Sequence, residues 1–97
     1  MRFLVEVTNH LPADWPADKR AELVARERLR GSELVVAGSI LHIWRIAGRD
    51  ANVAVWECAD ADELHQLLTS LPAWPWMEIA VRALATHPLQ ATAIHKS

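Results

Sequence analysis

The chain opens with an alternation of apolar and polar positions. Across residues 2–8, RFLVEVT, the side chains of Phe3, Val5 and Val7 share one side, and the other side is polar except for Leu4. A period of two residues is typical of a strand with one buried face. We therefore predict a first strand here.

Apolar runs predict three more strands farther along the chain. Residues 40–47 and 52–57 are apolar segments on either side of the turn GRDA, and residues 77–84, MEIAVRAL, alternate again. Short apolar runs bounded by turn residues favour strands over helices.

Capping and breaker residues predict two helices between these strands. Pro16 suits the first turn of a helix, which should cover about residues 17–34. Asp60 and Glu63 have the spacing of a capping box, with Asp in place of the usual Ser or Thr. Pro72 disfavours helix in the residue before it, so the second helix should end there, at about residue 71.

The predicted order, β-α-β-β-α-β, is that of the α+β class with a ferredoxin-like fold. Such a fold has an antiparallel four-stranded sheet with two helices on one face. We expect a single domain over residues 1–97, in which residues 89–97 form an extended tail.

The strand at residues 40–47 should carry apolar side chains on both faces. Alternation places Leu41 and Ile43 on one side. The apolar residues of the other side are Ile40, Trp44 and Ile46. A strand buried on both faces needs a second cover, so we predict that a partner subunit's sheet packs here in a dimeric α/β-barrel-type assembly. Hydrophobic residues make up 52% of the chain and five are Trp, which also favours a homo-oligomer.

Charge, hydropathy and cysteine content restrict the partners. The formal net charge is −2 and the basic residues are scattered, which argues against nucleic acid. No segment approaches 18 uninterrupted apolar residues, so we expect no membrane partner and a cytoplasmic location. Cys58 is the single cysteine, and no histidines stand at HxH or HxxxH spacing, so we expect no metal site.

Glu27 is the most unusual residue of the first predicted helix. At 100° per residue it falls on the apolar arc, between Leu23 and Val24. The charged residues that gather on the opposite side are Lys19, Glu22, Arg26, Arg30 and Glu33. Burial there would raise its pKa from about 4.3 toward the range of a useful general base. The other interpretation is that Glu27 lies at the rim and pairs with an arginine.

The predicted strands at residues 40–47 and 52–57 carry the polar residues His42, Arg45 and Asn52. An unpaired polar group among apolar side chains is costly. Arg45 would either hold an anion or pair internally with Glu27 or Glu57. A histidine placed like His42 is more often a core or interface residue than a catalyst. Asn52 follows a glycine turn, where Asn is common for backbone reasons. Together with Glu27, these residues favour acid–base chemistry without a cofactor, in which a carboxylate moves the proton and a cationic side chain holds an anion.

Several longer segments are similar to a known family. They are LHIWRIAG, ANVAVWE, ELHQLLTSLPAWPWMEIAV and THP, together with the opening MRFLVEVTNHLP and the Glu in RERLR. In combination, the patterns W-R-x-x-G-x-x-x-N and L-P-x-[aromatic]-P-[aromatic]-M are fairly specific. Over residues 1–88 the chain thus resembles the muconolactone Δ-isomerase family.

The resemblance implies a small ferredoxin-like subunit in a ring-like homo-oligomer, a decamer built from dimers. It implies isomerisation of a small lactone, muconolactone, to the enol-lactone of 3-oxoadipate in the β-ketoadipate pathway of aromatic catabolism. It also implies that neither a metal nor an organic cofactor takes part.

The resemblance also implies roles for individual residues. Glu27 matches the family's helix carboxylate and is the candidate base, and Arg45 would hold the substrate carboxylate or the oxyanion. His42 and Asn52 match polar positions that could donate to the lactone carbonyl. The aromatic residues that would wall the pocket, from the same or a neighbouring subunit, are Trp44, Trp74 and Trp76.

This chain departs from the family pattern at several aromatic positions. Trp74 and Trp76 replace the usual Phe and Tyr, and Ile40 stands where a Trp is usual. Trp56 and Glu57 stand where Phe and Asp are more familiar. A methylated or chlorinated lactone is an alternative substrate. A chloromuconolactone dehalogenase is an alternative activity. So are a non-catalytic ferredoxin-like binding or assembly domain and a cofactor-free monooxygenase of the dimeric α+β barrel type.

Overall fold

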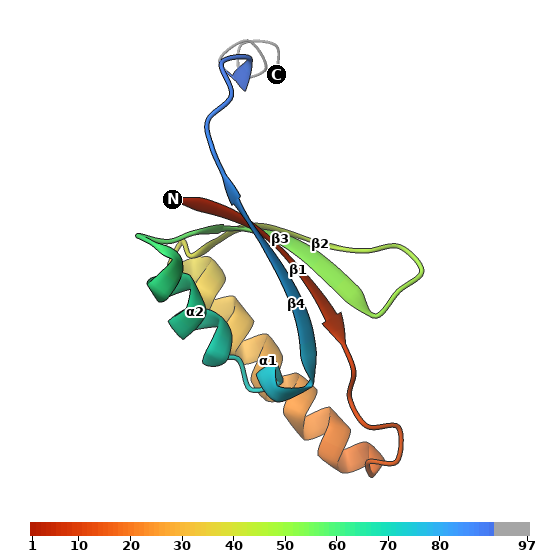
Figure 1. Cartoon of the computed structure of the whole chain (residues 1–97). Coiled ribbons are helices and arrows are strands. Elements are labelled where there is room, and N and C mark those ends of the chain that lie inside the picture. Colours follow the sequence, from red (N-terminus) through yellow and green to blue (C-terminus); the bar gives the residue numbers. More distant parts are fainter. Residues whose placement is uncertain (91–97) are drawn as a thin grey trace.

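The predicted order of elements is confirmed in the computed structural model, which describes residues 1–90 (Figure 1). The elements are β1 (Arg2–Asn9), α1 (Ala17–Val36), β2 (Ile40–Arg45), β3 (Ala51–Glu57), α2 (Ala61–Thr69), a short 3₁₀ helix η1 (Trp74–Trp76) and β4 (Met77–Leu84). Their boundaries differ from the predicted ones by at most two residues. From residue 91 on, the predicted tail lies outside the described residues.

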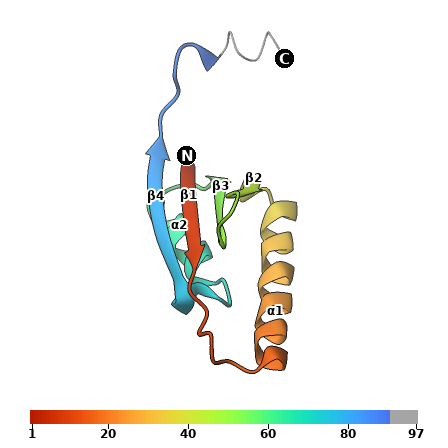
Figure 2. The same cartoon turned by 90° about the vertical axis from the view of Figure 1, so that its right-hand side faces the viewer.

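The four strands form one antiparallel sheet in the order β2-β3-β1-β4. Both helices lie against the same face of this sheet (Figures 1 and 2). The ferredoxin-like α+β fold expected from the sequence is therefore confirmed. Within residues 1–90, no helix is long and apolar enough to span a membrane.

The core lies between the sheet and the two helices. The alternation predicted for β1 is confirmed, because Phe3, Val5 and Val7 are all buried and Val5 has no exposed surface. These side chains pack against Leu34 of α1 and Leu64 of α2. Burial of large apolar side chains is the main force that holds the helices on this face.

The pairing of β2 with β3 contains a bulge that the sequence pattern did not reveal. Ile40 pairs with a buried residue of β3 and the next pair involves His42, so Leu41 is an extra residue without a partner. The bulge brings Ile40 to the helix-covered face together with Ile43. The prediction that Ile40 shares a side with Trp44 is therefore wrong, because an inserted residue reverses the alternation.

Strand β2 is one of the two outer strands of the sheet, and most of it is exposed within one chain. Ile40 is its only buried residue, whereas Trp44 is 54% exposed. The prediction of a strand buried on both faces is therefore not met within a single subunit. Its covering by a partner subunit stays a prediction.

The capping box predicted at the start of α2 is confirmed. An Asp60 carboxylate oxygen accepts a hydrogen bond from the Glu63 N–H at 2.8 Å. In return, Glu63 accepts one at 3.2 Å from the N–H of Ala59, the residue before the cap, and not from that of Asp60 as in the usual capping box. Two backbone donors at the helix start are thereby satisfied.

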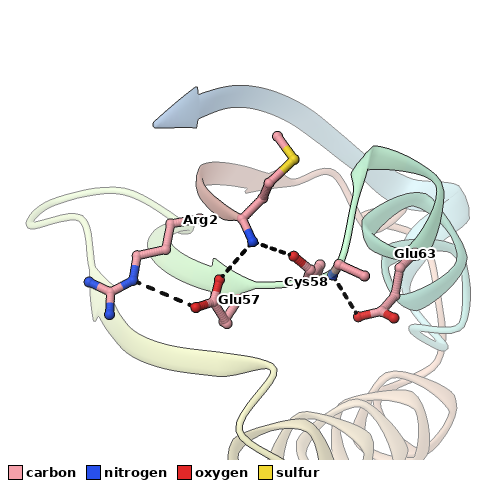
Figure 3. A network of polar contacts seen from close by, with 6 residues as sticks. Arg2, Glu57, Cys58 and Glu63 are labelled. Atoms are coloured by element: carbon pink, nitrogen blue, oxygen red, sulfur yellow. Dashed lines mark hydrogen bonds and ion pairs between the residues drawn. The ribbon is translucent and has the colours of Figure 1, made fainter. Parts of the chain in front are cut away.

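The first residues of the chain lie against the end of β3 (Figure 3). The amino group of Met1 donates to the Cys58 carbonyl oxygen at 2.7 Å and lies 3.1 Å from the Glu57 carboxylate. The same carboxylate lies 3.9 Å from the guanidinium of Arg2. Glu57 is thus engaged by the start of β1.

Candidate active site

A cavity of about 560 Å³ lies between α1 and the helix-covered face of the sheet. This volume falls in the range of small-molecule sites, roughly 300–1,000 Å³. Apolar residues make up part of its wall. The polar residues in its lining include Asn9, Glu27, Arg28, Arg45, Asp50 and Asn52.

The sequence of α1 explains why space remains there. Leu23 and Leu34 are the buried residues of this helix and fix it against the rest of the protein. Between them, Glu27 and Gly31 follow Leu23 at intervals of four and therefore lie on the same side of the helix. Neither fills the gap with a large apolar group, and a Cβ placed on Gly31 would meet nothing within 4 Å. Opposite them the sheet contributes the small side chain of Ala54.

Glu27 is half-buried in this cavity, as the helix periodicity predicted. Burial raises the pKa of its carboxyl, and a hydrogen bond from the Ala73 N–H partly offsets that rise. This N–H donates to Oε1 at 2.9 Å. Among residues 1–90 no arginine is within ion-pairing distance of Glu27, so its alternative placement in an arginine pair at the rim is not observed.

Arg45 and Asn52 are direct partners across the pairing of β2 with β3. Both line the cavity. In the part of the chain that the structure describes, Arg45 forms an ion pair with neither Glu27 nor Glu57. The interpretation of Arg45 as half of an internal pair is therefore not supported within one subunit, and its guanidinium is available to an anion.

His42 and Trp44 lie on the other face of the sheet. Their rings stack with centroids 5.5 Å apart and an angle of 11° between the planes. Trp44 also borders the cavity, because β2 is an edge strand, whereas His42 is not among the lining residues. The structure does not bring His42 to Glu27 within one chain.

The two tryptophans of the L-P-x-[aromatic]-P-[aromatic]-M segment lie in η1 and do not line the cavity of their own chain. Trp74 is 41% exposed. Trp76 packs edge-on against Trp15, with centroids 4.7 Å apart, and the Lys19 ammonium lies 4.2 Å from the Trp15 ring. These contacts hold the loop before α1 against η1. That either indole walls a neighbouring subunit's pocket stays a prediction.

Sequence reasoning missed Arg28, which lines the cavity from α1, and three further groups at this site. One is the backbone N–H of Ala73, for which no side-chain signal exists. The other two are Asn9 and Asp50, whose side chains are joined by a hydrogen bond of 3.1 Å at the end of the cavity formed by β1 and the β2–β3 turn. Only the strand register brings these two residues together.

The described part of the chain holds no cluster of three or more His, Cys, Asp or Glu residues that could bind a metal ion. The prediction of a reaction without a cofactor is not tested by this observation and stays a prediction.

Together, the fold and the cavity define a ferredoxin-like α+β protein with a candidate ligand site built around one partly buried carboxylate. The chain belongs to the muconolactone isomerase family of enzymes, because the family model described as muconolactone delta-isomerase matches residues 1–90. The resemblance inferred from the sequence motifs is thereby confirmed.

Individual relatives agree with this assignment. The chain is 41% identical to muconolactone Delta-isomerase 2 of Acinetobacter lwoffii, over 98% of this chain and 96% of the relative. It is 38% identical to muconolactone Delta-isomerase of Acinetobacter baylyi, over 91% and 92% of the two chains. A crystal structure of muconolactone isomerase superposes with a TM-score of 0.86 at 39% identity, covering 91% of this chain and 92% of that one.

Proposed function

We propose that this protein isomerises muconolactone to the enol-lactone of 3-oxoadipate, a step of the β-ketoadipate pathway, with Glu27 as the base. The observation that carries this proposal is the position of Glu27: a half-buried carboxylate of raised pKa in a ligand-sized cavity that also holds unpaired cations. Membership of the muconolactone isomerase family supports the choice of substrate.

The reaction moves one proton and one double bond. Muconolactone is an unsaturated five-membered lactone with an acetate arm. Removing the ring proton beside the ring oxygen gives a delocalised anion with charge on the carbonyl oxygen. Returning the proton to the ring carbon beside the carbonyl completes the shift, so no atom is gained or lost. One base can perform both transfers if it lies over the face of the ring.

Glu27 has the properties that such a base needs. Burial raises its pKa, so its carboxylate binds a proton more strongly than an exposed one. Its place on α1, on the opposite side of the cavity from Ala54 of the sheet, leaves room for a flat ring between helix and sheet. General-base catalysis by a positioned carboxylate contributes roughly 10²–10⁴-fold in rate.

Two kinds of donor serve the negative charges of the substrate. Asn52, on the sheet side, would donate to the carbonyl oxygen as charge develops on it, usually the largest stabilising effect in such reactions. Arg45 from β2 and Arg28 from α1 both line the cavity, and neither has an ion-pair partner among residues 1–90. Either guanidinium can bind the acetate arm through paired hydrogen bonds.

A homo-oligomer, a decamer built from dimers, is the assembly that we propose for this chain. The open face of the sheet supports it, because the stacked rings of His42 and Trp44 and the side chain of Leu84 are exposed there. Exposed aromatic groups on a flat face are typical of subunit interfaces. A second sheet packed on this face would cover them.

The test is ultraviolet-monitored turnover of muconolactone in the presence of EDTA. Wild-type protein is compared with Glu27→Gln and with Glu22→Gln, an exposed carboxylate on the same helix. We expect turnover by the wild type and by Glu22→Gln, and a loss of roughly 10²-fold or more in Glu27→Gln. Turnover that survives in Glu27→Gln would remove Glu27 as the base. No turnover by the wild type would refute the proposed reaction.

A further inference from the structure

The segment LPAWPW, residues 71–76, contacts Glu27 through its backbone. Ala73 donates its N–H to Oε1 of Glu27 at 2.9 Å, across 46 residues of sequence. Neither indole of the segment lines the cavity, whereas Ala73 does. The polar group that this segment contributes to the site is therefore an amide N–H, and neither of its aromatic rings takes part.

The local backbone explains why this N–H is available. Ala73 is the residue that precedes η1, where N–H groups have no partner within the helix. Its carbonyl oxygen accepts the Trp76 N–H at 3.0 Å, and the Leu71 carbonyl accepts the Trp74 N–H at 3.0 Å. The N–H groups of Trp74 and Trp76 thus bond within the turn, and that of Ala73 is left for Glu27.

The same backbone is held in place on both sides. Pro72 and Pro75 flank Ala73 and Trp74, and the ring of a proline fixes one of its two backbone dihedrals. Leu71 and Ala73 are both buried, which anchors the turn in the protein. The direction of the N–H is therefore set before any ligand binds.

One oxygen of Glu27 is engaged and the other is not. Oε1 accepts the Ala73 N–H, and no hydrogen bond to Oε2 occurs among residues 1–90. A single bond to one oxygen restricts rotation of the carboxylate about its terminal bond and makes the two oxygens inequivalent. The unengaged oxygen is the one that can exchange a proton without breaking the anchor.

We propose that the Ala73 N–H is a positioning group for the base: it holds Oε1 of Glu27, so that Oε2 removes the proton beside the ring oxygen and returns it beside the carbonyl. This inference rests on the proposed function. It assigns to the two prolines that flank Ala73 and Trp74 a role in the orientation of the carboxylate. It also accounts for the hydrogen bond that lowers the pKa of Glu27 while burial raises it.

The decisive variant replaces the amide at residue 73 by an ester. Cys58 is the only cysteine and lies between the two halves of the chain, so residues 58–97 can be synthesised and ligated to expressed residues 1–57. Lactic acid in place of Ala73 removes the N–H and keeps the methyl group. The controls are the all-amide ligated chain and an ester at Ala85, an exposed residue after β4.

A recombinant pair gives the same comparison by another route. Ala73→Pro also lacks the N–H, and the φ of −88° at Ala73 must shift only modestly to reach the value of about −65° that proline requires. Ala73→Gly keeps the N–H and loses only the methyl group. Folding of each variant is checked by circular dichroism before the measurements, and either the ester or Ala73→Pro is sufficient for the test.

Two readouts are measured, steady-state kinetics against pH and the carbon NMR titration of the Glu27 carboxyl in chains labelled in residues 1–57. Without the N–H we expect kcat to fall roughly 10-fold with little change in KM, the effect of one hydrogen bond to a charged group. The pKa of Glu27 and the acidic limb of the rate profile should both move to higher pH. The all-amide chain and the ester at Ala85 should show none of these shifts, and Ala73→Gly, which keeps the N–H, should leave the Glu27 titration where it is in the wild type.

An ester chain with the kcat and the Glu27 titration of the all-amide chain would overturn the inference and leave the proposed function intact. Absence of turnover in every chain, the all-amide one included, would instead contradict the proposed function. If no chain is active, the Glu27 titration still tests the role of Ala73. An unchanged titration in the ester chain would overturn that role as well. A titration moved to higher pH would support the hydrogen bond from Ala73 to the carboxylate.

Discussion

Arg45 and Asn52 face one another across β2 and β3, so a cation and an amide lie side by side on the wall of the cavity. Glu27 belongs to α1, on the opposite wall. The site is therefore divided between helix α1, which carries the base, and the sheet, which carries two donors. A flat anionic substrate between them would meet the base on one face and the donors at its edge.

Replacing Arg45 tests this division. We expect Arg45→Met to raise KM for muconolactone roughly 10-fold or more, because a charge-assisted hydrogen bond contributes about 1.5–3 kcal/mol and 1.4 kcal/mol corresponds to a factor of ten. Arg45→Lys should lie between wild type and Arg45→Met, because lysine keeps the charge and loses the paired geometry. The measurement is steady-state kinetics at fixed ionic strength.

Arg49 provides the matched control for this prediction. It lies in the turn after β2, is exposed and does not line the cavity. Arg49→Met removes the same charge without changing the site, so its KM should match that of the wild type. Equal KM values for Arg45→Met and wild type would show that Arg45 does not bind the substrate.

The raised pKa of Glu27 predicts a stability effect with a defined sign. Because its pKa is higher in the folded than in the unfolded protein, Glu27 favours folding most below its unfolded pKa of about 4.3. That contribution is lost as the pH rises through the folded value. Glutamine does not titrate, so the Tm of Glu27→Gln minus that of wild type should become more positive between pH 4 and pH 7.

Thermal unfolding at several pH values measures this difference, with Glu22→Gln as the control on the exposed side of α1. The Tm of Glu27→Gln minus that of wild type could instead stay constant or become more negative as the pH rises. That result would mean that burial does not disfavour the Glu27 carboxylate in the folded protein.

The exposed Trp44 predicts how the subunits assemble. Trp44→Glu puts a charge on the open face of the sheet, where a second sheet would have to exclude water from it. We expect this variant to elute as a smaller species than wild type in size-exclusion chromatography with light scattering. Ala21→Glu, an exposed position on α1, should assemble like the wild type. A wild type that runs as a monomer at micromolar concentration would contradict the proposed oligomer.

The capping box of α2 predicts a local stability effect far from the cavity. Asp60→Ala removes the side chain that accepts the Glu63 N–H, which typically costs about 1 kcal/mol. For a domain of this size the Tm should fall by roughly 4–8 °C. Asp62→Ala, in the same first turn but not at the cap, should have a smaller effect. Similar Tm losses in the two variants would indicate that helix-end charge, and not the cap, is responsible.

The comparison of sequence and structure is most instructive at β2. Alternation predicted the strand itself and the opposite faces of Ile43 and Trp44. It failed at Ile40, because the bulge at Leu41 depends on how β2 meets β3 and leaves no mark in the apolar pattern. A bulge in one strand is decided by the register with its partner, and register is not a local property.

The sequence by itself determined the order of the elements, the buried face of β1, the cap of α2 and the place of Glu27 on the apolar side of α1. Each of these follows from residues within one or two turns or strand periods of each other, so periodicity and capping chemistry suffice to predict them. The tertiary structure alone decided which distant groups meet. The N–H of Ala73 reaches Glu27, and Asn9 reaches Asp50, because packing and strand register bring together segments that no local pattern connects.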